Sequence, residues 1–237
     1  MSGHSKWSTI KHQKGVKDAR RGKLFSKLAM QIALGAKAGA DLSMNSTLRI
    51  VVAEAKRAGM PKENIERAIS RGSGKTSGDE LKEAVYEAYG VGGAAMVIKT
   101  ITDNSNRILA EIRGVLNKNG GKLASSGSVA YQFSQAGEIV ISKDAVSDQD
   151  GLELELIDHG LDDWIDAGDS IIIYTKTENL ANISKFLNTK NIALQAQKII
   201  LKPASFLELS DDLVAKNQVI LGKLEELDDV QEVFVNF

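Results

Sequence analysis

The sequence predicts an α+β protein with an N-terminal three-helix domain followed by two α/β domains of ferredoxin-like type, one inserted in the other. Up to about residue 72, apolar residues recur at the three- and four-residue spacing of amphipathic helices. After residue 80, short strand-like runs alternate with helical segments. A final helix and strand, at about 211–227 and 230–235, have no partner nearby in the sequence, so we expect them to return to the first α/β domain.

Three short amphipathic helices account for residues 18–72. The first carries an apolar residue at every fourth position: Leu24, Leu28, Ile32 and Ala36. Asn45 or Ser46 can cap the second helix, and Pro61 suits the first turn of the third, because its missing N–H has no intrahelical partner there. One apolar face per helix predicts a small bundle. The polar faces carry further cations: Arg49, Lys56, Arg57, Lys62, Arg67 and Arg71.

The first α/β domain begins with strands at 84–89 and 94–102, joined by a glycine-rich turn, and continues with a helix capped by Asp103 or Asn104. The elements expected in the inserted domain are, in order, an alternating run at Val129, Tyr131 and Phe133, a strand at 139–141, a helix at 152–157, a strand at 170–175, a helix capped by Asn179 and an extended segment at 192–202. We place the domains at 1–75, at 76–124 together with 206–237, and at 125–205.

Charge is distributed unevenly along a chain whose net charge is only -1. Up to Lys75 there are 16 Lys and Arg and 5 acids, whereas the remaining residues hold 14 Lys and Arg and 26 acids. The balance of +11 in the first part and -12 in the second recovers the net charge of -1. Such polarity predicts an anionic partner for the N-terminal part.

Several function classes find no support in the sequence. The chain has no cysteine, which excludes disulfides, thiolate metal sites and cysteine nucleophiles. The run Gly72-Ser73-Gly74-Lys75-Thr76 resembles the end of a P-loop, but the first glycine of that motif would fall on Ile69, so we interpret the run as a flexible linker. No nucleophile elbow and no metal-ligand spacing is present, so we expect no catalysis, no cofactor and no metal.

The basic start of the chain has some features of a targeting peptide. Arg20 and Arg21 form a twin-arginine pair before an apolar stretch. Gln31 interrupts that stretch and Lys37 lies where cleavage would occur, so we expect no cleaved peptide. No apolar run approaches the ~20 residues needed to cross a bilayer. The sequence therefore predicts no membrane partner.

Five stretches strongly resemble the YebC/PmpR family: GHSKW at 3–7, RGKLFSKL at 21–28, GMPKENIERAI at 59–69, TDNSNR at 102–107 and SGSVAYQF at 126–133. The resemblance implies a three-domain cytoplasmic protein with a helical first domain and two α/β domains, one inserted in the other. It also implies nucleic acid as the partner. Members are described as probable transcriptional regulators that bind DNA, mitochondrial relatives resemble translational activators, and some bacterial relatives relieve ribosome stalls on difficult peptide sequences.

The basic N-terminal run is the candidate nucleic-acid-binding site. Its proposed contact residues are Lys6, Trp7, Lys11, His12, Lys14, Lys17, Arg20, Arg21, Lys23 and Lys27. The cations would contact phosphates and release condensed counterions, and Trp7 can stack on an unpaired base. The competing interpretation is a solvated basic run, with Trp7 covering the bundle.

The segment from Asp144 to Asp169 holds ten acids and no Lys or Arg. A solvated acidic face is its first interpretation, and a docking surface for a basic protein partner is the second. Three functions therefore remain open. The first is a DNA-binding transcriptional regulator, the second is a translation factor that binds ribosomal RNA at the ribosome, and the third is a protein-interaction scaffold that uses the acidic face.

Overall fold

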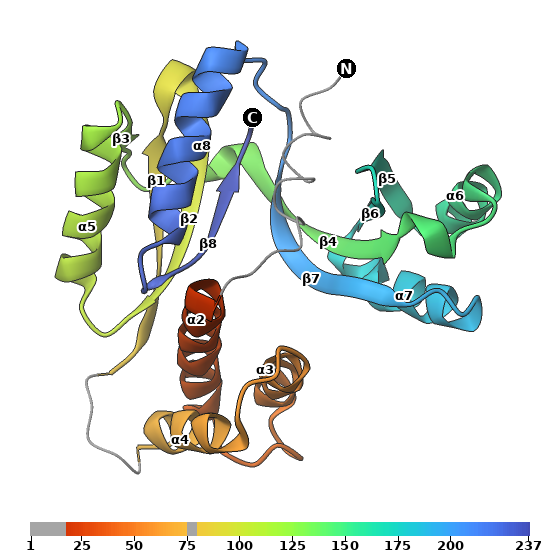
Figure 1. Cartoon of the computed structure of the whole chain (residues 1–237), viewed down its shortest axis with the longest axis horizontal. Coiled ribbons are helices and arrows are strands. Elements are labelled where there is room, and N and C mark those ends of the chain that lie inside the picture. The colour runs from red at the N-terminus through yellow and green to blue at the C-terminus, as the bar shows by residue number, and fades with distance from the viewer. Residues whose placement is uncertain (1–17, 75–79) are drawn as a thin grey trace. The chain divides into compact units, whose positions relative to one another are not determined.

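The computed structural model describes residues 18–74 and 80–237, with side chains from residue 21 onward (Figure 1). The described residues form two compact units. The first unit comprises residues 18–129 and 210–235, and the second comprises residues 130–209 with 236–237. The predicted division into three domains at residues 75, 124 and 205 stays a prediction. Within this part of the chain, no helix combines the length and the apolar character that a membrane span requires.

Three helices open the first unit: α2 (Asp18–Ala36), α3 (Ser46–Arg57) and α4 (Lys62–Gly72). Three of the four apolar residues predicted to face inward from the first helix are buried: Leu28, Ile32 and Ala36. They pack with Leu48 and Val52 of α3 and with Ile65 and Ala68 of α4. Leu24 is the exception, because it is exposed. Asn45 caps α3, and its side-chain oxygen accepts a hydrogen bond from the backbone N–H of Leu48 at 2.9 Å. Pro61 keeps an extended backbone just before α4 rather than within its first turn, which corrects the prediction by one residue.

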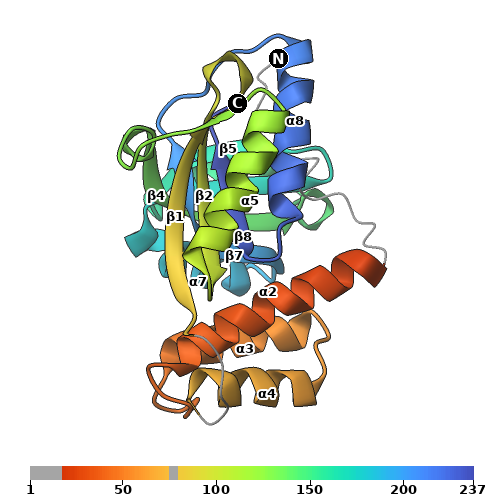
Figure 2. The ribbon, with the colours of Figure 1, turned by 90° about the vertical axis from the view of Figure 1, so that its left-hand side faces the viewer.

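A four-stranded antiparallel sheet and two helices complete the first unit. The sheet has the order β3-β1-β2-β8, with strands β1 (Lys82–Tyr89), β2 (Ala95–Thr102), β3 (Lys122–Leu123) and β8 (Val230–Val235). Helices α5 (Ser105–Lys118) and α8 (Asp211–Glu225) lie side by side on one face of this sheet (Figure 2). The C-terminal strand β8 pairs with β2, so the tail returns to the first sheet as expected.

The second unit has the β-α-β-β-α-β order of a ferredoxin-like domain. Its elements are β4 (Phe133–Ser142), α6 (Gln149–Asp158), β5 (Leu161–Asp166), β6 (Ser170–Thr175), α7 (Leu180–Thr189) and β7 (Leu194–Pro203). The strands are antiparallel in the order β5-β6-β4-β7. Isoleucines of β4 and β6 pack against leucines of α6 and α7 to form the core.

Three details of the second unit correct the sequence-based prediction. Phe133 begins one long strand, β4, while Tyr131 lies in a short 3-10 turn and is 77% exposed, so the alternating run is not a separate strand. Strand β5 was not expected, because its sequence LDDWID is rich in Asp, a residue that strands disfavour. Asn179 precedes α7 but makes no side-chain capping hydrogen bond.

Candidate nucleic-acid interface

The described cations of the helical bundle differ in what they contact. Six of the predicted contact residues lie outside the described residues: Lys6, Trp7, Lys11, His12, Lys14 and Lys17. Arg20 belongs to α2, and its side chain is not described. Arg21, Lys23 and Lys27 remain, and the bundle adds the cations on the polar faces of α3 and α4.

Lys23 and Lys27 form hydrogen bonds to backbone carbonyls of the same unit. The Nζ atom of Lys23 donates to the backbone carbonyl of Glu226 at 2.7 Å, and that of Lys27 donates to the carbonyl of Glu225 at 3.1 Å. Both carbonyls lie at the C-terminal end of α8, where helix carbonyls lack intrahelical partners. Burial lowers the pKa of the Lys27 ammonium, and the nearby carboxylate of Glu225 offsets part of this effect. These two lysines therefore join α2 to α8 within the first unit.

Arg21 lies on another side of α2, next to the turn between α3 and α4. Its guanidinium stands over the Phe25 ring, with 5.4 Å between the guanidinium carbon and the ring centroid. It also approaches Gly59 so closely that a Cβ at that position would lie 2.8 Å from Nη2. Gly59 has a φ of +77°, which favours glycine and lets the chain turn sharply there. Arg21 is exposed at this corner.

Two further cations precede the same turn. Lys56 and Arg57 occupy the last turn of α3 and are both exposed. Neither side chain forms an ion pair or hydrogen bond with another residue in the described part of the chain. Cations in the last turn of a helix interact favourably with the helix dipole, which accounts for their position. Their charged groups nevertheless face water. We call Arg21, Lys56 and Arg57 the cationic corner.

Three other cations of the bundle contact other residues of the chain. Lys37 Nζ donates to Glu80 at 2.6 Å, and Arg49 donates to the carbonyl of Leu42 at 3.1 Å. Arg71 pairs with Asp103 at 3.4 Å. A free basic residue is therefore better identified from contacts than from its place on a polar face.

Asp103 belongs to a chain of ion pairs that ends at a buried carboxylate. Arg107 Nη2 contacts Asp103 at 2.9 Å and Asp229 at 2.6 Å, and Thr102 Oγ1 donates to Asp229 at 2.7 Å. Hydrogen bonds to Asp229 and Asp103 raise the pKa of the Arg107 guanidinium. Together with Arg71, these residues link α4 to α5 and β8. We call them the Asp229 network.

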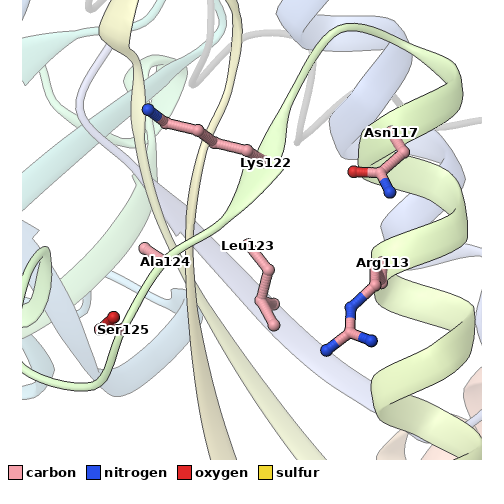
Figure 3. A pocket seen from close by; sticks show the side chains of 6 residues that line it. All are labelled: Arg113, Asn117, Lys122, Leu123, Ala124 and Ser125. Carbon is pink, nitrogen blue, oxygen red and sulfur yellow. The ribbon is translucent and has the colours of Figure 1, made fainter.

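A shallow hollow of about 370 Å³ lies between α5 and β3, lined by Arg113, Asn117, Lys122, Leu123, Ala124 and Ser125. Arg113 and Asn117 project from α5, whereas the Lys122 side chain leaves β3 in another direction (Figure 3). The Lys122 ammonium lies 5.7 Å from the centroid of the Tyr89 ring. The two cations therefore do not converge on one ligand position, and no sequence motif singled them out.

The run of acids between Asp144 and Asp169 is partly neutralised by ion pairs within the second unit. Lys143 pairs with Asp166, and Lys202 pairs with Asp163 at 2.7 Å. In the described part of the chain, no group of three or more His, Asp or Glu side chains is placed to hold a metal ion.

Comparison with known proteins gives matches along nearly the whole chain. The model of the TACO1/YebC N-terminal domain matches residues 5–75, and that of the TACO1/YebC second and third domain matches residues 81–237. A probable transcriptional regulatory protein of Borrelia turicatae is 45% identical over 238 residues, which cover 100% of this chain and 97% of that protein. One from Fervidobacterium nodosum is 43% identical, with 100% and 94% covered.

A solved structure agrees with the fold. The crystal structure of a conserved hypothetical protein from Aquifex aeolicus superimposes with a TM-score of 0.86 at 39% identity, covering 98% of this chain and 96% of that chain. Together with the matches of both family models, this similarity shows that the chain belongs to the TACO1/YebC family.

Proposed function

We propose that this protein is a cytoplasmic nucleic-acid-binding regulator that holds its target through the basic N-terminal part, and that it acts on transcription by binding DNA. The observation that carries the proposal is the cationic corner. Arg21, Lys56 and Arg57 are exposed beside one turn, without an anionic partner among the described residues. The names of the relatives, probable transcriptional regulatory proteins, support the regulatory role.

Electrostatics explains why phosphates suit this part of the chain. Each cation that contacts a phosphate releases condensed counterions, so affinity falls as salt concentration rises. The first 75 residues carry the charge balance of +11 that such binding needs, while the acidic remainder repels the same polyanion. Phosphate contacts position a protein on nucleic acid without reading its sequence, and they are the contacts that this surface offers.

RNA at the ribosome is the second candidate target. The tryptophan within the basic run supports it, because an aromatic ring can stack on an unpaired base, and unpaired bases are common in RNA loops. Crosslinking in cells, followed by sequencing of the bound nucleic acid, separates the two targets. Recovery of promoter DNA supports transcription, and recovery of ribosomal RNA supports translation and contradicts the DNA proposal.

A triple substitution tests the cationic corner. Arg21→Gln, Lys56→Gln and Arg57→Gln remove three phosphate contacts, so the slope of log K against log salt on duplex DNA should become less negative by about 2.7. Lys176→Gln with Lys185→Gln is the control, because both lysines are exposed in the second unit and have no ion pair with a described residue. We expect this control to leave the slope unchanged.

The outcomes separate the proposals. An unchanged slope in the corner variant, with thermal unfolding like that of the wild type, would exclude the corner as the contact. If the wild-type protein binds no nucleic acid at all, the remaining alternative is a scaffold that recruits a basic protein through its acidic face.

A further inference from the structure

The contact between α2 and the end of α8 occupies cations that the sequence assigns to phosphate binding. Lys23 and Lys27 are four residues apart on α2, and Gln31 follows at the same spacing, so the three lie on one side of the helix. Gln31 Nε2 donates to Gln231 Oε1 at 3.2 Å, which continues the contact onto β8. One side of α2 is therefore engaged, while Arg21 on another side stays exposed.

The partner of these lysines presents oxygen atoms that carry negative charge. Their direct ligands are the carbonyls of Glu225 and Glu226, at the helix end that carries the negative pole of the dipole. The carboxylates of Glu225, Asp228 and Glu232 also attract the Lys27 ammonium. We call residues 225–232 the acidic segment. It offers Lys23 and Lys27 the kind of ligand that a phosphate chain would offer.

We propose that the acidic segment is an intramolecular competitor, which occupies Lys23 and Lys27 until a nucleic-acid chain displaces it. This inference rests on the proposed function, because it concerns the same basic surface. A phosphodiester carries a full negative charge, whereas a helix-end carbonyl carries a fraction of one, so phosphate can replace the carbonyl at the ammonium. Displacement would release α2 from α8 and add two cations to the interface.

The competition has a reciprocal consequence. A change that weakens the contact between α2 and the acidic segment without altering the two lysines should strengthen nucleic-acid binding, at most by the same factor. The two lysines are half-buried and remain at the edge of the contact, where water and an approaching ligand can reach them. The contact therefore lowers the affinity for nucleic acid and is not a fixed part of the core.

A double substitution in the acidic segment tests this competition in the full chain. Glu225→Gln with Asp228→Asn weakens the attraction for Lys27 while leaving the backbone carbonyls in place. We expect affinity for a single-stranded oligonucleotide to rise about five-fold or more. The slope of log K against log salt should stay close to that of the wild type, because Lys23 and Lys27 contact the same phosphates in both complexes.

A matched control separates competition from a general charge effect. Asp144→Asn with Asp150→Asn makes the same charge change at exposed positions of the second unit. We expect this control to leave the affinity unchanged. In the wild-type protein, oligonucleotide binding should also increase amide hydrogen exchange within residues 225–232. Thermal unfolding of each variant checks that the fold is kept.

The possible results distinguish failure of the competitor from failure of the proposed function. If the wild type binds but the two double variants have equal affinity, the competitor is refuted and the nucleic-acid function stands. Unchanged or slower exchange in the acidic segment upon binding also refutes it. If the wild type does not bind the oligonucleotide, the proposed function and the competitor fail together.

Discussion

Replacing Asp229 by Asn removes the charge at the buried end of the Asp229 network. The residue is only 8% exposed, and it accepts hydrogen bonds from Thr102 Oγ1 at 2.7 Å and from Arg107 Nη2 at 2.6 Å. An asparagine keeps one acceptor oxygen of similar shape but turns the other oxygen into an NH₂ donor. The substitution therefore loses a charge-assisted hydrogen bond without creating a large cavity.

The expected cost follows from what remains around Arg107. Its guanidinium keeps the carboxylate of Asp103 at 2.9 Å and is 45% exposed at the side chain, so Asp229→Asn leaves no isolated buried charge. The cost is then that of one hydrogen bond to a charged group, or about 1.5–3 kcal/mol of the free energy of unfolding. The larger penalty of a broken buried ion pair does not apply here.

Urea unfolding followed by circular dichroism measures this cost. Asp212→Asn is the control, because Asp212 makes an exposed pair with Lys216 on the surface of α8, and such a pair contributes about 0.5 kcal/mol or less. If Asp229→Asn lowers the free energy of unfolding no more than this control, the buried carboxylate does not stabilise the fold in the way described.

Two other substitutions probe local geometry in the first unit. Glu87 accepts hydrogen bonds from the backbone N–H groups of Gly127 at 2.6 Å and Val129 at 2.5 Å. Glu87→Gln should therefore lower the free energy of unfolding by about 1.5–3 kcal/mol and speed amide exchange at both positions. Exchange as slow as in the wild type would contradict this role. A Cβ on Gly72 would meet the carbonyl oxygen of Ala33 at 1.9 Å, so Gly72→Ala should force α4 away from α2 and lower stability by about 1–3 kcal/mol. An unchanged melting temperature would show that the helices do not approach so closely.

Long periodic elements could be predicted from the sequence. The three helices of the bundle were found because their apolar spacing and caps are local signals, as with Asn45 at the start of α3. The return of the tail to the first sheet was found because the strand at 230–235 had no local partner, and the structure confirms this prediction by pairing β8 with β2.

Short or acidic strands could not be predicted in this way. Strand β3 spans only Lys122–Leu123 and depends on pairing with β1, and β5 carries three aspartates at the edge of its sheet. Their pairing is set by tertiary contacts rather than by propensity.

The contacts of a predicted site residue could not be predicted from the sequence either. Lys23 and its partner Glu226 are 203 positions apart, so no local pattern could show that this lysine is engaged within the fold. The free cations Lys56 and Arg57 resemble Arg49 and Arg71 in sequence, and only the contacts distinguish them.

The central claim is that the basic N-terminal part holds a phosphate chain while the acidic remainder stays clear of it. Photo-crosslinking of the full chain to an oligonucleotide, with the attachment sites mapped by mass spectrometry, tests this claim directly. The account predicts attachment within residues 1–74. Attachment concentrated within residues 144–169 would contradict it.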